Sequence, residues 1–99
     1  EWSRSNARGI GSHFASRVHL QIGSHDGNFG QRQATVALIR YFESITVQSF
    51  RKESSTAAYA TFVHRFRTSS GQSLTRKVYV HIIRSGNTFQ IDDITQYGG

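Results

Sequence analysis

Residues 31–45 read QRQATVALIRYFESI, and the apolar side chains in this stretch recur at the spacing of one helix face. That face is formed by Ala34, Leu38, Tyr41, Phe42 and Ile45. Gly30 precedes the stretch and suits the N-cap position. We therefore predict a helix from Gln31 to Ile45 and expect Leu38 and Phe42 to be buried.

The residues before this helix predict a second, shorter helix and a strand. Ile10 and Phe14 are four residues apart, which favours a helix over residues 6–14. We expect this helix to begin upstream of Glu1, with Trp2 extending its apolar stripe. Residues 18–22 alternate as a half-buried strand does. Residues 23–28 are expected to form a turn, with Asp26-Gly27 as its strongest signal, followed by a very short return strand at Phe29.

The residues after the helix predict four strands, over residues 48–53, 59–68, 74–84 and 88–97. A polar break at residues 54–57 and turns at 69–72 and 85–87 separate them. This order predicts an α+β fold, in which a curved antiparallel sheet wraps around the helix. We assign residues 1–99 to a single domain of this kind, lacking the start of its first helix.

Composition and charge exclude several classes of site. The chain has no cysteine, which excludes disulfides and thiolate metal sites. Its longest apolar run is too short to cross a bilayer, and no signal peptide is visible at Glu1-Trp2-Ser3-Arg4. Twelve Lys and Arg against six Asp and Glu give a net charge of +6.

The basic residues are dispersed along the predicted strands. We expect a basic outer strip and name six anion-binding candidates: Arg51, Lys52, Arg65, Arg67, Arg76 and Lys77. Such a strip suits an acidic protein or an envelope polymer better than a DNA duplex, because the charges follow a curved sheet. We do not expect a nucleic-acid partner, and any such binding should be weak and salt-dependent.

Period two places two histidines on apolar strand faces. His64 shares a face with Ala60, Phe62 and Phe66, and His81 shares one with Tyr79 and Ile83. His64 could act as a general base, or it could be a buried histidine bonded to a backbone carbonyl or a tyrosine hydroxyl. His81 could line a pocket or a dimer contact. His19 is expected to face outward.

Asp92-Asp93 is the only acidic pair. Consecutive strand residues face opposite sides, so one carboxylate should point inward unless a bulge intervenes. An inward Asp93 could supply acid–base chemistry, or it could pair with Arg76 or Arg84. The pocket-lining candidates are Phe62, His64, Phe66, Tyr79, His81 and Asp93.

A resemblance runs over nearly the whole chain. The matching segments are Ser5-Asn6-Ala7-Arg8, Ser12-His13-Phe14, residues 18–22, Gly27-Asn28-Phe29-Gly30-Gln31, Tyr41-Phe42, Ser49-Phe50, Tyr59-Ala60, residues 77–80 and Phe89-Gln90-Ile91. They resemble a family of small uncharacterised proteins from Bacteroidetes, similar to the nuclear transport factor 2-like superfamily that includes ketosteroid isomerases. The resemblance implies a cone of curved sheet around a helix, and a periplasmic or extracellular location. A cystatin-like inhibitor would share this outline, but its Gln-x-Val-x-Gly wedge is not present.

No catalytic, cofactor or metal motif is found, so no catalytic residue, cofactor or metal ligand is assigned. We predict a non-catalytic module that binds a small apolar ligand in the cone or a protein on the open sheet face. The alternatives are a small acid–base enzyme of the ketosteroid isomerase type and a basic binder of nucleic acid or anionic polymer. Both faces of residues 78–83 are apolar, which predicts a homodimer through the sheet.

Overall fold

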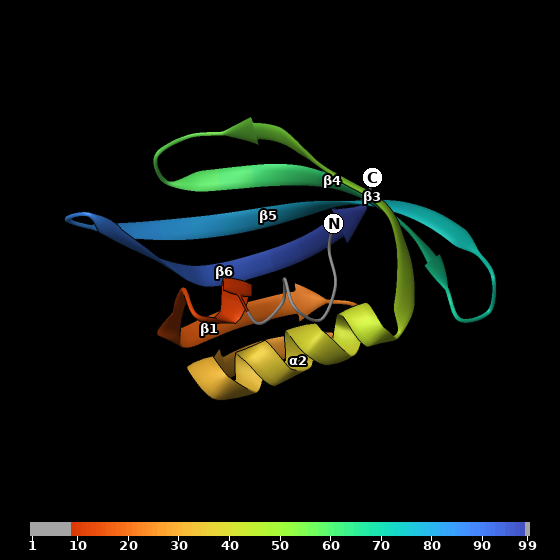
Figure 1. The fold of residues 1–99 in the computed structure, drawn as a ribbon, viewed down its shortest axis with the longest axis horizontal. Helices are drawn as coiled ribbons and strands as arrows, with labels where there is room; N and C mark the ends of the chain where they lie inside the picture. Colours follow the sequence, from red (N-terminus) through yellow and green to blue (C-terminus); the bar gives the residue numbers. More distant parts are fainter. Residues whose placement is uncertain (1–8, 99) are drawn as a thin grey trace.

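Residues 31–43 form the expected helix, labelled α2 in Figure 1, in the computed structural model, which describes residues 9–98. Gly30 is extended and precedes the first helical residue, as predicted for an N-cap. The buried side chains of Gln31–Glu43 are Ala34, Ala37, Leu38, Tyr41 and Phe42. The predicted buried face is therefore confirmed, with Leu38 only 1% and Phe42 only 7% exposed.

The helix ends two residues before the predicted boundary. The Ser44 backbone N–H donates to the carbonyls of Arg40 and Tyr41, and the Ser44 hydroxyl donates to the Tyr41 carbonyl. Ile45 belongs to the next strand, where it pairs with Thr68. The run Ile45-Thr46-Val47 has three β-branched residues, which favour a strand over a helix.

Six strands complete the fold. They are β1 (Phe14–Ile22), β2 (His25–Gly30), β3 (Ile45–Ser55), β4 (Tyr59–Thr68), β5 (Ser73–Ser85) and β6 (Thr88–Gly98). The third strand is longer than predicted, because it includes Ser54 and Ser55 from the expected polar break. The tight turn between β5 and β6 is confirmed, with Ser85 pairing to Thr88.

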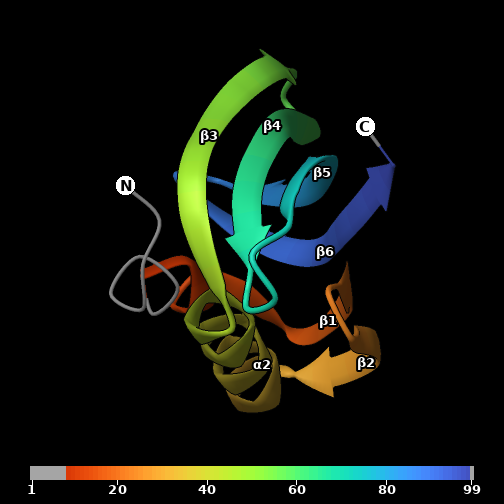
Figure 2. The same cartoon turned by 90° about the vertical axis from the view of Figure 1, so that its right-hand side faces the viewer.

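The strands form one sheet in the order β2-β1-β6-β5-β4-β3. All neighbouring pairs are antiparallel except β1 with β6, which is parallel. The sheet curls so that α2 lies beside β1 on the inner side and closes the space toward the start of β3 (Figure 2). The predicted α+β fold with a curved sheet around a helix is confirmed.

The segment before β1 differs from the prediction. Residues 9–11 are helical, but Phe14 is already in β1 and is buried. Asn6, Ala7 and Arg8, like Trp2, lie outside the described residues. Gly11 is buried against the Thr35 side chain of α2, and a Cβ at this position would collide with that side chain. This glycine allows the segment to approach the helix closely.

The first hairpin turn lies within the predicted range 23–28 but is confined to Gly23-Ser24, and Asp26 and Gly27 belong to β2. Ile22 pairs with His25, which leaves a two-residue loop. Gly23 has φ of 61°, as the first central position of a type II′ turn requires. Its backbone also passes Tyr41 so closely that a Cβ would lie 2.6 Å from Tyr41 Cδ1. The turn therefore forms where only glycine fits, and β2 is longer than predicted.

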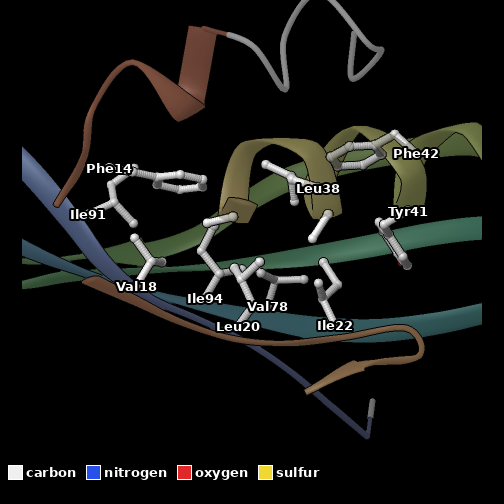
Figure 3. Close-up of a cluster of buried hydrophobic side chains, with 12 residues drawn as sticks. Phe14, Val18, Leu20, Ile22, Leu38, Tyr41, Phe42, Val78, Ile91 and Ile94 are labelled. Carbon is white, nitrogen blue, oxygen red and sulfur yellow. The ribbon is translucent and has the colours of Figure 1, made fainter. Parts of the chain in front are cut away.

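The core lies between α2 and the inner face of β1, β5 and β6. Figure 3 shows side chains from these elements converging on Leu38. The buried residues labelled there are Phe14, Val18, Leu20, Ile22, Leu38, Tyr41, Phe42, Val78, Ile91 and Ile94. Among the described residues, no helix is long and apolar enough to cross a membrane.

Truncation of Leu38 tests the packing of the helix. We expect Leu38→Ala or Phe42→Ala to lower the free energy of unfolding by about 2–5 kcal/mol, because each leaves a void in the core. Val36 is 43% exposed on the same helix, so Val36→Ala is the matched control. Its effect should stay within about 0.5 kcal/mol. Chemical denaturation followed by circular dichroism measures both, and equal effects of Leu38→Ala and Val36→Ala would contradict the assigned face.

Candidate functional site

An apolar cavity of about 210 Å³ lies between α2 and the curved sheet. Every described residue that lines it is apolar: Ile10, Ile22, Leu38, Phe42, Phe50, Ala60, Phe62, Val78, Val80, Ile82, Ile91 and Ile94. Period two explains this lining, because Val78, Val80 and Ile82 alternate along β5 and so share its inner face. The described residues therefore offer the cavity hydrophobic contact and no hydrogen-bonding side chain.

His64 lies at one end of this cavity and is fully buried. Its ring packs against Phe50, with centroids 5.1 Å apart, and stacks on Phe66 at 4.6 Å. His64 Nε2 is 2.9 Å from the Tyr41 hydroxyl. Of the two interpretations of this residue, the geometry matches the buried histidine bonded to a tyrosine.

A short hydrogen-bonded chain fixes Tyr41. Gln96 Nε2 donates to the Tyr41 hydroxyl oxygen over 2.7 Å, and the Gly23 N–H donates to Gln96 Oε1 over 3.1 Å. The hydroxyl proton is then free to be donated to His64 Nε2. The helical pattern of the sequence places Tyr41 only in the apolar face. The hydrogen bond of Tyr41 to His64 could have been anticipated from its chemistry, because a buried tyrosine hydroxyl needs a partner.

Burial changes the proton affinity of both groups. Desolvation lowers the pKa of His64 from 6.5 to about 4, an effect that the Ser49 backbone partly opposes. Desolvation also raises the pKa of Tyr41 to about 12, against smaller opposing effects of Gln96 and Arg76. His64 Nδ1 is buried without a well-formed hydrogen bond to any described residue. Neutral His64 is therefore a weak base near pH 7.

The two aspartates both face outward, which corrects the expectation of an inward Asp93. His81 pairs with Asp93, whereas the next residue of β5, Ile82, pairs with Ile91. Asp92 is thus the extra residue of a β-bulge, and the bulge resets the alternation so that Ile91 and Ile94 are both buried.

Their partners are histidines and not the expected arginines. His81 Nδ1 is 2.6 Å from Asp92 Oδ1, and His19 Nδ1 is 3.3 Å from Asp93 Oδ1. Thr95 also donates to Asp93 over 2.7 Å. His19 faces outward as predicted.

The six pocket-lining candidates are therefore separated. Phe62 lines the apolar cavity, His64 lies at its end, and Phe66 lines a different hollow beyond His64. Tyr79, His81 and Asp93 are on the outer face of the sheet, where they line neither hollow. The aliphatic residues of β5 and β6 that line the cavity are not among the sequence candidates, because they have the same pattern as core residues.

The basic candidates are also divided between the two faces. Arg65 and Arg67 are exposed on β4, and Lys77 forms an ion pair of 3.3 Å with Glu53. Arg51 pairs with Val63 in the register of the outer face, whereas Lys52 pairs with Phe62. Arg76 lies opposite the buried His64, so it points inward and does not belong to the outer strip.

The described residues give little basis for acid–base chemistry in the cavity. No ionisable side chain lines it among residues 9–98. In the same range, no group of three His, Asp or Glu side chains is arranged to hold a metal ion. The lining residues that the structure describes can enclose an apolar group.

Comparison with known proteins agrees with this fold. Residues 2–96 match the Domain of unknown function (DUF4783), so the chain belongs to this family. A DUF4783 protein from Bacteroides fragilis has a TM-score of 0.72 at 16% identity over 98% of this chain and 90% of its own. A DUF4783 protein from Bacteroides ovatus has a TM-score of 0.69 at 17% identity, over 95% of this chain and 84% of its own. A designed protein of the nuclear transport factor 2-like fold has a TM-score of 0.64 at 12% identity, over 91% of this chain and 81% of its own. No curated protein matches the sequence.

Acid should destabilise the fold through His64. Because the folded-state pKa of about 4 is below the ordinary value of 6.5, the unfolded chain binds this proton first. The contribution of His64 to the free energy of unfolding is fully present above pH 6.5 and is lost as the pH falls toward 4. Between about pH 7 and pH 5 the loss should be about 2 kcal/mol. Urea denaturation at both pH values measures this loss. Between the two pH values, His64→Phe should lose less unfolding free energy than the wild type, by this amount. An identical loss in the two proteins would contradict the interpretation.

Proposed function

We propose that the protein is a non-catalytic binding module whose apolar cavity takes one small apolar molecule. The observation that supports this is the lining of the cavity, which is apolar at every described residue. Ligand sites are typically concave and mostly apolar. The volume of about 210 Å³ exceeds that of a protein cavity that stays dry and binds benzene, which is about 150 Å³.

The chemistry around the cavity supports binding over catalysis. An acid–base enzyme of the ketosteroid isomerase type needs a base that reaches the substrate. The buried His64 is neutral and bonded to Tyr41, and both Asp92 and Asp93 face away. We therefore rank the enzymatic alternative second. A turnover that disappears in His64→Gln, with the fold intact, would reverse this order.

Filling the cavity tests the proposal. Ala60 lines the cavity, so Ala60→Leu should occupy part of it and remove ligand binding. Thr61 is the next residue on the same strand and faces outward, so Thr61→Leu is the matched control. Toluene and naphthalene serve as probes, with binding measured as the rise in thermal midpoint and by ligand-observed NMR.

The expected result is saturable binding in the wild type and in Thr61→Leu, and none in Ala60→Leu. Circular dichroism confirms that each variant folds. If no probe binds the wild type, or if Ala60→Leu binds as well as Thr61→Leu does, the cavity is not a ligand site.

A second role is favoured by a different surface, the outer face of the sheet. The rings of Tyr59 and Tyr79 lie 5.6 Å apart there, and Ile83 and Tyr97 are each 43% exposed. In Figure 2 the only helix with a label, α2, lies on the inner side of the sheet. Tyrosine-rich apolar patches are typical of protein interfaces. We infer that two copies of the chain associate through this face.

Sedimentation velocity at micromolar concentration tests the dimer. Tyr79→Lys should shift the equilibrium to monomer, because it places a charge in the middle of the outer face. Val36→Lys adds the same charge to an exposed position on α2 and should leave the dimer unchanged. A wild type that sediments only as a monomer would exclude this interface.

The outer face also carries Arg65 and Arg67, which are exposed. They support an acidic protein or an anionic envelope polymer as a partner more than a nucleic acid, because these charges lie on a curved sheet. A periplasmic or extracellular location remains a proposal that rests on the family resemblance.

A further inference from the structure

A second hollow, of about 390 Å³, lies beyond His64 at the other end of the interior. It is bounded by the turn after β1, the C-terminal end of α2, the turn between β4 and β5, and β6. Its lining is mixed. Phe66, Leu74 and Ile45 contribute apolar surface, and Tyr41, Arg76 and Gln96 contribute polar groups.

Arg76 is the unusual residue of this hollow, because it is a cation on the inner face of the sheet. It pairs with buried His64, and two residues later Val78 is buried on the same face. Arg76 as a whole residue is of intermediate exposure. Its one hydrogen bond to a described residue runs from Nη1 to the Thr75 carbonyl over 3.0 Å. No carboxylate of residues 9–98 forms an ion pair with it.

The described groups that line the hollow with Arg76 supply no negative charge. Among the described residues, none that lines the hollow is acidic. Tyr41 stays neutral at physiological pH, since burial raises its pKa to about 12. The Gln96 amide is held by its bonds to Tyr41 and to the Gly23 N–H. A guanidinium on the inner face of the sheet, with donors that no described residue uses, favours an anion in the hollow.

We propose that this hollow binds a small monocarboxylate with an apolar body. Guanidinium and carboxylate are planar and match in a bidentate pair. One cation balances one negative charge, which favours a carboxylate over doubly charged phosphate. The apolar body would lie against Phe66, Leu74 and Ile45. This site does not depend on the apolar cavity, because the two hollows share no lining residue.

Titration with benzoate tests the proposal, using calorimetry and backbone amide NMR of the whole chain. We expect saturable binding that Arg76→Gln weakens about tenfold or more, since a charged hydrogen bond contributes about 1.5–3 kcal/mol. Arg65→Gln removes the same charge from an exposed position on β4 and should change the affinity less than about twofold. Arg76→Lys keeps the positive charge but loses the two parallel N–H donors of the guanidinium. Its benzoate affinity should lie between those of Arg76→Gln and Arg65→Gln.

Three comparisons make the result decisive. Benzyl alcohol, which lacks the charge, should not shift the amides of Gln96 or Gly23. Ala60→Leu, which fills the other cavity, should bind benzoate as the wild type does. Inorganic phosphate should bind more weakly than benzoate, and tighter phosphate binding would overturn the carboxylate assignment.

The site itself would be overturned by absence of saturable benzoate binding, or by equal affinities of Arg76→Gln and Arg65→Gln. Circular dichroism and the thermal midpoint establish folding. If Arg76→Gln does not fold, the comparison of Arg76→Lys with wild type decides: unchanged affinity overturns the site, and weaker binding supports it.

Discussion

The hydrogen bond of 2.9 Å between the Tyr41 hydroxyl and His64 Nε2 joins α2 to β4 across the inside of the curved sheet. The two residues are 23 positions apart, and both are buried. Gln96 extends the connection to β6 through the same hydroxyl. Because a buried polar group without a partner is costly, each of these side chains restricts the others, and this contact fixes where the helix can lie on the sheet.

The interior also contains two hollows of different character, which share no lining residue. Toward Phe50, every described lining residue is apolar. Toward Phe66, the hollow contains Arg76 and the Gln96 amide. The rings of Phe50 and Phe66 both pack against His64, with centroid distances of 5.1 and 4.6 Å. A neutral His64 is compatible with both hollows, because the charged imidazolium would be poorly solvated at this buried position.

The bulge at Asp92 determines which side chains of β6 lie on the outer face. It turns both carboxylates outward, where His81 and His19 are their partners, and it leaves Ile91 and Ile94 in the core. Without the extra residue, one carboxylate would enter the apolar interior, where an unpaired charge is strongly unfavourable. The bulge therefore keeps the cavity apolar and the acidic pair on the surface.

The sequence by itself determined the α+β fold, the apolar face of α2 and the burial of His64, because these follow from local periodicity and side-chain polarity. Only the tertiary structure decided the end of the helix at Glu43, the turn at Gly23 and the direction of Asp93. It also placed Arg76 inside and separated the two hollows. The reason is physical: a one-residue bulge reverses the facing of every later strand residue, and a close backbone contact selects one turn among several, and both depend on partners distant in the chain.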